Sequence, residues 1–120
     1  MHIAIRKTVL PLAIAAVAYI ISAAAAMAHP TVDIVAANWK FTPAKISIPL
    51  NEPTTLRLTS SSGVHGLQSD ELGIPLTKIT PGEFTLVTFT PKKAGTYVLH
   101  CAVVCGPGHS DMTLTIGVTP

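Results

Sequence analysis

The sequence predicts an all-β domain built as a β-sandwich. From residue 31 onward, short runs of Val, Ile, Leu, Thr and Phe are interrupted by Pro or Gly about every ten residues. This part of the chain has no stretch with the period of an amphipathic helix. Residues 55–59 and 84–89 alternate between apolar and polar side chains, as strands do when one face packs on a core and the other meets water.

The first three expected strands cover residues 32–36, 45–49 and 54–59. Each contains β-branched residues, which suit a half-buried pleated surface, and Pro-containing segments separate them. The remaining expected strands cover residues 66–67, 77–79, 83–89, 95–101 and 112–118. Pro81-Gly82 and residues 91–95 precede two of them, because Pro fixes φ and Gly permits positive φ where strands reverse.

Large aromatic side chains dominate sandwich cores, so we expect the tryptophan and the phenylalanines of this domain in the interior. They are Trp39, Phe41, Phe84 and Phe89.

The N-terminal segment has the composition of an export signal. Arg6 and Lys7 form a basic start, an apolar run follows over residues 9–26, and Ala26-Met27-Ala28 supplies the small residues that a signal peptidase reads. We expect a signal peptide over residues 1–28, cleaved before His29. The alternative is a single uncleaved membrane anchor, since roughly 18 to 20 apolar residues can span a bilayer. Residues 29–120 then form one domain in the periplasm or elsewhere outside the cytoplasm, either soluble or tethered.

The charge of this domain gives no indication of nucleic-acid binding. The whole chain has eight Lys and Arg residues against six Asp and Glu residues. Two of the basic residues lie in the predicted leader, so the domain itself is close to neutral.

Both cysteines fall in one short segment, residues 101–112, with the spacing Cys-x3-Cys-x3-His-x2-Met. Thiolate, imidazole and thioether ligands together favour copper over hard cations. Residues 106–108, Gly-Pro-Gly, supply a tight turn that disfavours a helix there and lets Cys and His converge. One loop cannot complete a coordination shell, and His65, which follows a Ser-Gly stretch and opens the next strand, is the best candidate for a further ligand.

Simpler interpretations account for fewer of these residues. A disulfide between the two cysteines is common in exported proteins, but it does not explain His65, His109 and Met112 at these spacings. A structural zinc site using both cysteines and both histidines leaves Met112 without a role. A mononuclear blue-copper site needs only one Cys. His100 precedes Cys101 in a strand, so its side chain is expected on the opposite face, at the surface.

The segment over residues 97–112 resembles the CuA-binding loop of cytochrome c oxidase subunit II, a cupredoxin, and Val64-His65-Gly66 resembles the upstream ligand motif of that family. Residues 37–43, Ala-Asn-Trp-Lys-Phe-Thr-Pro, are similar to its aromatic segment at the start of the domain. The resemblance covers most of residues 31–118. It implies a cupredoxin-like Greek-key β-sandwich over residues 29–120.

By position, the resemblance implies a CuA-type site with two copper ions and six ligands. They are the bridging thiolates of Cys101 and Cys105, the terminal imidazoles of His65 and His109, and weak axial contacts from Met112 and the main-chain carbonyl of Val103. The family usually has Glu at the position of Val103, but only the carbonyl is used there. Subunit II also usually has two membrane spans, whereas this chain has at most one.

The resemblance therefore implies an electron carrier that converts no substrate itself. It would accept single electrons from a cytochrome c or another cupredoxin and pass them to a terminal oxidase or reductase, with membrane oxidase subunits as further partners. The alternative function is a periplasmic copper chaperone or storage protein that uses the same ligands.

Overall fold

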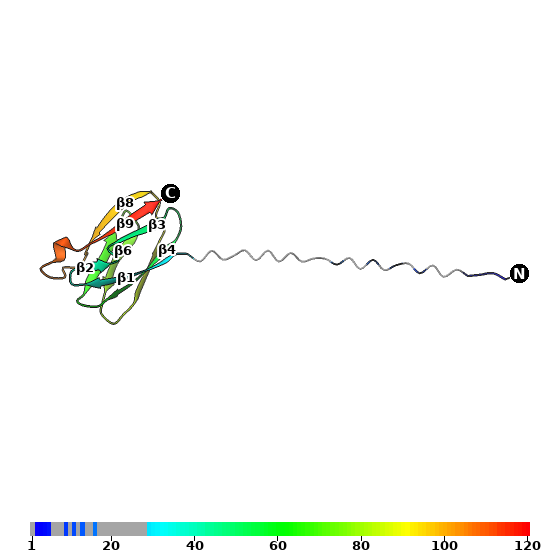
Figure 1. Cartoon of the computed structure of the whole chain (residues 1–120), viewed down its shortest axis with the longest axis horizontal. Helices are drawn as coiled ribbons and strands as arrows, with labels where there is room; N and C mark the ends of the chain where they lie inside the picture. The colour runs from blue at the N-terminus through cyan, green and yellow to red at the C-terminus, as the bar shows by residue number, and fades with distance from the viewer. Residues whose placement is uncertain (1, 6–8, 10, 12, 14–15, 17–28) are drawn as a thin grey trace.

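The computed structural model describes residues 2–5, 9, 11, 13, 16 and 29–120, and all of its strands lie in the last of these ranges (Figure 1). Most of the predicted signal peptide lies outside the described residues, so its cleavage stays a prediction. Within the described part of the chain, no helix has the length and apolar character needed to cross a bilayer.

Nine strands and one short turn of 3-10 helix make up the domain, which confirms the all-β prediction. In chain order they are β1 (Thr31–Ala37), β2 (Lys40–Thr42), β3 (Lys45–Pro49), β4 (Thr54–Ser60), β5 (His65–Ser69), β6 (Ile74–Ile79), β7 (Thr85–Phe89), β8 (Gly95–His100), η1 (His109–Asp111) and β9 (Thr113–Thr119). β3 has the predicted bounds. The short strand β2 was not predicted from the sequence.

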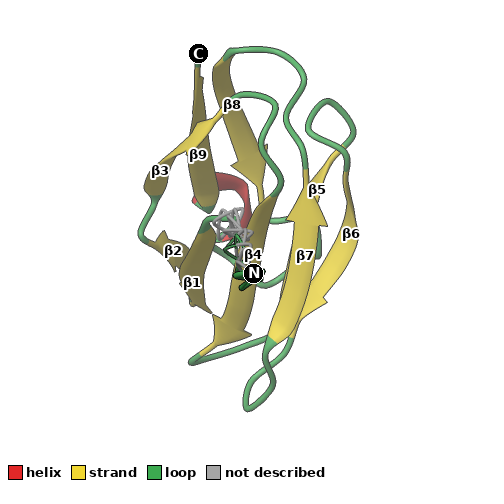
Figure 2. Ribbon diagram, turned by 90° about the vertical axis from the view of Figure 1, so that its right-hand side faces the viewer, coloured by secondary structure: helices red, strands yellow, loops and turns green. Residues whose placement is uncertain are grey.

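The strands form two main sheets and a separate two-stranded hairpin, which lies beside β7 (Figure 2). One sheet has the order β2-β1-β4-β7 and the other the order β3-β9-β8. The pairs β1–β4 and β3–β9 are parallel, whereas the other pairs are antiparallel. The β5–β6 hairpin adjoins both sheets, because β6 contacts β7 and β5 contacts β8. This arrangement places the start of β5 beside the end of β8.

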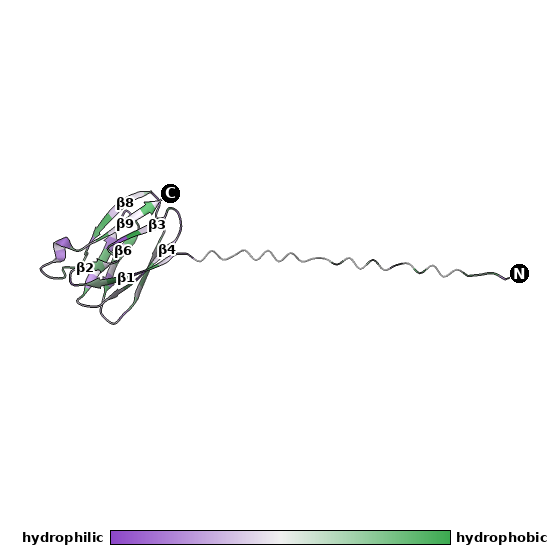
Figure 3. Ribbon diagram, in the orientation of Figure 1, coloured by the Kyte–Doolittle hydropathy of each residue, from purple (hydrophilic) through white to green (hydrophobic). Residues whose placement is uncertain are grey.

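The core lies between the sheets and is built from alternate residues of their strands. In β4, Leu56 and Leu58 are buried and the residues that alternate with them, Thr55, Arg57 and Thr59, are partly exposed, as the sequence pattern predicts. Leu58 pairs with Ile34 of β1, which is also buried. The opposite layer contributes Ile46, Ile48, Leu99, Leu114, Ile116 and Val118. In contrast, η1 is a hydrophilic turn at one end of the sandwich (Figure 3).

The aromatic prediction is right for two residues and wrong for two. Phe41 and Phe89 are buried in the core. Phe84 is 59% exposed and lies under the guanidinium of Arg57, whose Cζ is 3.7 Å from the ring centroid. Trp39 is 39% exposed and lies against the loop between β8 and β9. Both rings therefore have a contact that replaces core burial, a cation in one case and a glycine-rich backbone in the other.

Candidate metal centre

The loop between β8 and β9 brings most of the predicted ligands to one end of the sandwich. Cys101 directly follows β8, and Met112 directly precedes β9. The Cys101 N–H donates to the Met112 carbonyl at 3.0 Å, which closes the base of the loop. Cys105 lies in the loop and His109 begins η1, just after the Gly-Pro-Gly turn. The two strands thus hold the loop ends in fixed register, and the loop folds back over itself.

His65 is supplied by the neighbouring hairpin, as its position in the sequence predicted. It is the first residue of β5 and is completely buried. Its Nε2 lies 2.7 Å from the Ser62 carbonyl, an acceptor only, so Nε2 carries the proton. Its Nδ1 therefore has a free lone pair and lies 3.8 Å from Cys101 Sγ. A hydrogen bond of this kind fixes both the tautomer and the ring orientation of a metal-binding histidine.

The chain segment before His65 is itself tied down. Ser60 is buried, and its hydroxyl donates to the carbonyls of Ser62 and Gly63. The Asn38 N–H donates to the Ser62 hydroxyl at 3.0 Å, which connects this segment to the turn after β1. The Ser62 carbonyl that orients the imidazole is therefore held by contacts outside the loop of the cysteines.

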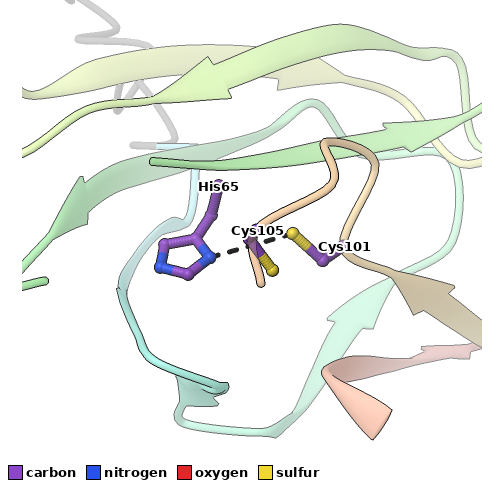
Figure 4. Close-up of side chains that lie close together, drawn as sticks. All are labelled: His65, Cys101 and Cys105. Carbon is purple, nitrogen blue, oxygen red and sulfur yellow. Dashed lines mark hydrogen bonds between the residues drawn. The ribbon is translucent and has the colours of Figure 1, made fainter. Parts of the chain in front are cut away.

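Two free thiols and an imidazole converge on one point (Figure 4). The donor atoms of His65, Cys101 and Cys105 all lie within 4.8 Å of one another, with Cys101 buried and Cys105 partly buried. The structure therefore does not contain the disulfide that was the simplest alternative for the two cysteines. A soft cation fits this donor set, because thiolates and imidazole are its preferred ligands.

The other three predicted ligands lie around the same pair of sulfur atoms. Cys105 Sγ is 3.5 Å from Nδ1 of His109 and 3.8 Å from Sδ of Met112, which is completely buried. Cys101 Sγ is 3.1 Å from the carbonyl oxygen of Val103. Each sulfur atom thus has an imidazole Nδ1 and one weaker candidate ligand beside it, the Val103 carbonyl for Cys101 and the Met112 thioether for Cys105. His100 is exposed, as expected of a residue that faces away from the site.

The environment of Cys105 favours its neutral thiol in the absence of a cation. Burial, a hydrogen bond with Cys101 and the negative charge of Cys101 together raise the pKa of Cys105 to about 11. A bound metal ion has the opposite effect, because metals coordinate the thiolate and displace the proton. Binding of a cation at this point would therefore release protons.

Trp39 covers the loop, which the sequence did not indicate. Its indole Nε1 donates to the Cys105 carbonyl at 3.0 Å. The ring also lies on two glycines, since a β-carbon on Gly106 would come within 3.0 Å of Nε1 and one on Gly108 within 2.5 Å of Cγ. The sequence pattern indicates only a turn at these two glycines. They also leave room for the ring, a role that depends on residues far apart in the chain.

Three comparisons with known proteins found similar sequences and structures. The family model described as cupredoxin-like domain matches residues 10–113. A cytochrome c oxidase subunit 2 of Thermus thermophilus is 32% identical over 88 residues, which cover 73% of this chain and 64% of that protein. The chain therefore spans less than two thirds of the length of that relative.

Solved structures show the same fold. The periplasmic domain of subunit II of cytochrome oxidase (CoxB) of Bradyrhizobium japonicum superposes with a TM-score of 0.68 at 17% identity, covering 75% of this chain and 83% of that one. A chain of a heme-copper terminal oxidase dimer superposes with a TM-score of 0.66 at 25% identity, covering 75% of this chain and 65% of that one.

Proposed function

This chain belongs to the cupredoxin-like domain family, and on that basis we propose that it is a copper-binding electron-transfer protein with a dinuclear, CuA-type site. The observation that carries the proposal is the convergence of two free thiols with the buried His65, all within 4.8 Å. A mononuclear site would need only one of the thiols. The similarity to an oxidase subunit 2 agrees with this proposal.

We assign six ligands to the two copper ions, and the distances between the donor groups support the assignment. The thiolates of Cys101 and Cys105, the imidazoles of His65 and His109, the thioether of Met112 and the carbonyl of Val103 would hold the two ions. All six lie in the β8–β9 loop or at the start of β5. A zinc site using only the thiols and imidazoles would not account for the buried thioether beside Cys105.

Copper held by these residues would supply one-electron chemistry, which requires that the ligands move little when the charge changes. The protein contributes the rigidity that this chemistry requires. The main-chain hydrogen bond from Cys101 to Met112 fixes the loop ends, and the hydrogen bond to the Ser62 carbonyl fixes the ring of His65. Burial of Met112 and His65 keeps water away from one side of the site. The ligands therefore have little freedom to rearrange when the charge changes.

The surface beside the site offers an approach for redox partners. Val104, next to Cys105, is 85% exposed, and Val64, next to His65, is 37% exposed. Exposed apolar patches, when contiguous, mark contact surfaces between proteins, and these two valines each directly precede a proposed ligand in the chain. We propose that a cytochrome c or another cupredoxin donates electrons here, and that the acceptor is a terminal oxidase or reductase with membrane subunits. We also propose a location outside the cytoplasm, which the predicted leader supports; one of the structural neighbours is itself a periplasmic domain.

Copper counting and electron paramagnetic resonance of the copper-loaded protein test the proposal. We expect two coppers per chain and a seven-line hyperfine pattern, because the unpaired electron is shared by two copper nuclei. Cys101→Ser and Cys105→Ser should each abolish this pattern, whereas the control His100→Ala, at an exposed position, should keep it. One copper with a four-line pattern would contradict the dinuclear site. Ready loss of copper to a chelator would indicate a chaperone instead.

A further inference from the structure

Gly66 is the second residue of β5 and directly follows His65. Its φ lies outside the left-handed region, so the backbone conformation accepts any residue at this position. Glycine in the interior of a strand weakens it and often marks a close approach of another segment. The reason for a glycine at this position must therefore be space.

That space is filled by the loop of the cysteines. A β-carbon on Gly66 would lie 2.5 Å from Cγ2 of Val103 and 3.2 Å from its main-chain nitrogen. The first distance is shorter than any real contact of this kind, so the side chain of Val103 occupies the place of a β-carbon. In addition, the Ala102 N–H donates to the Gly66 carbonyl at 2.9 Å. The strand and the loop thus meet backbone to backbone.

We propose that Gly66 is a positioning residue, which fixes the Val103 carbonyl against Cys101 Sγ and holds it in register with His65. The peptide units on either side of Cys101 are each held by one hydrogen bond. The Cys101 N–H is bound to Met112, and the Ala102 N–H is bound to Gly66. Next to these points the Val103 carbonyl lies 3.1 Å from Cys101 Sγ. One strand segment thereby carries one proposed ligand and places another.

Val103 cannot yield easily to a larger residue at position 66. It is β-branched, so its χ1 angle is strongly restricted, and its main-chain nitrogen is also close to Gly66. A methyl group on residue 66 would therefore push the loop backbone away from β5. That movement would lengthen the hydrogen bond from the Ala102 N–H to the Gly66 carbonyl and displace the Val103 carbonyl. The role of the Val103 carbonyl as a ligand rests on the proposed function, but the contact between Gly66 and Val103 can be tested without metal.

The test compares Gly66→Ala with Gly117→Ala. Gly117 lies in β9, where a β-carbon would be 3.6 Å from Ser47 Oγ and 3.7 Å from the Ile46 carbonyl, both ordinary contacts. In the reduced, copper-free protein we expect Gly66→Ala to speed hydrogen exchange of the Ala102 amide about tenfold, and Gly117→Ala to leave it unchanged. Adding Val103→Ala to Gly66→Ala removes the closest clash and should restore most of the protection.

The copper-loaded protein gives a second measurement. Gly66→Ala should retain two coppers but change the hyperfine splitting and the reduction potential, and the double variant should return both toward the parent values. If Gly66→Ala does not fold, Val103→Ala alone still removes the packing contact and should speed Ala102 exchange. Unchanged exchange in Gly66→Ala, or no recovery in the double variant, would overturn the positioning role. A parent protein that binds one copper or none would instead contradict the dinuclear site, while leaving the exchange result to decide about Gly66.

Discussion

Replacing Gly108 by Ala tests the contact between Trp39 and the ligand loop. A β-carbon at position 108 would lie 2.5 Å from Cγ, 2.6 Å from Cδ2 and 2.8 Å from Cβ of Trp39. These atoms are the rigid base of the side chain and not its far end. The backbone at Gly108 has φ of −90°, which Ala adopts without strain. The substitution therefore adds no backbone strain, and the contact with the ring is the interaction that it disturbs in the folded protein.

The magnitude follows from the two interactions that must change. Overpacking costs about 1–3 kcal/mol, and the lower part of that range applies because Trp39 is 39% exposed and its ring can move toward solvent. Moving the ring also breaks the bond from its Nε1 to the Cys105 carbonyl, which contributes about 0.5–1.5 kcal/mol. We expect the free energy of unfolding to fall by about 2 kcal/mol, or about 30-fold in the folded-to-unfolded ratio.

Urea unfolding of the reduced, copper-free protein measures this directly. Trp39 is the single tryptophan of the chain, so its fluorescence reports the contact while circular dichroism reports the fold. Trp39→Phe serves as a control, because it keeps a ring but removes the donor and should cost about 1 kcal/mol. A Gly108→Ala variant within about 0.5 kcal/mol of the parent, with unchanged fluorescence, would refute the reasoning.

Three further outcomes follow from the site. Because the pKa of Cys105 is raised to about 11, the rate of its alkylation in the copper-free protein should increase as the pH rises toward 11. The free energy of unfolding should decrease between the ordinary thiol pKa of 9.0 and about 11, because the unfolded chain loses this proton first. An alkylation rate with its midpoint near pH 9 would contradict the raised pKa. Met112→Leu should keep both coppers and shift the reduction potential, since the volume is conserved and only a weak ligand is lost; metal counting that finds neither ion would disprove it. Val103→Glu should keep two coppers and the seven-line pattern, because the carbonyl is the proposed ligand; loss of the pattern would show that the side chain of Val103 does more than pack on Gly66.

The alternation of apolar residues predicted the inner face of β4 correctly, because a strand with one buried face shows a period of two. The run over residues 84–89 was less informative. Leu86 and Val87 are adjacent and both apolar, so the pattern does not show which of them faces inward. In the structure Val87 is buried and Leu86 is exposed. The parallel pairing of β1 with β4 and of β3 with β9 could not be predicted either, because the pattern of residues within a strand does not indicate its partner.

The candidate ligands were easier to predict than the residues that hold them in place. Cysteine, histidine and methionine at close spacing are typical of a site for a soft metal ion, so the loop and His65 could be identified from the sequence. Trp39 could not, because its role depends on a contact with Cys105, which is 66 residues away in the chain. Gly66 contributes by having no β-carbon, which leaves space for Val103, and Ser62 contributes its main-chain carbonyl. Neither role has a characteristic residue type.

The position of β9 has a consequence for biosynthesis. It is the last strand of the domain, yet it lies in the middle of its sheet, between β3 and β8. A ribosome delivers β3 and β8 first, and they have no partner in that sheet until β9 follows. The loop before β9 is closed only when Met112 pairs with Cys101. A nascent chain therefore presents its thiols on an unfinished scaffold, and a copper donor that acted before β9 is in place would meet cysteines without the geometry to retain the metal.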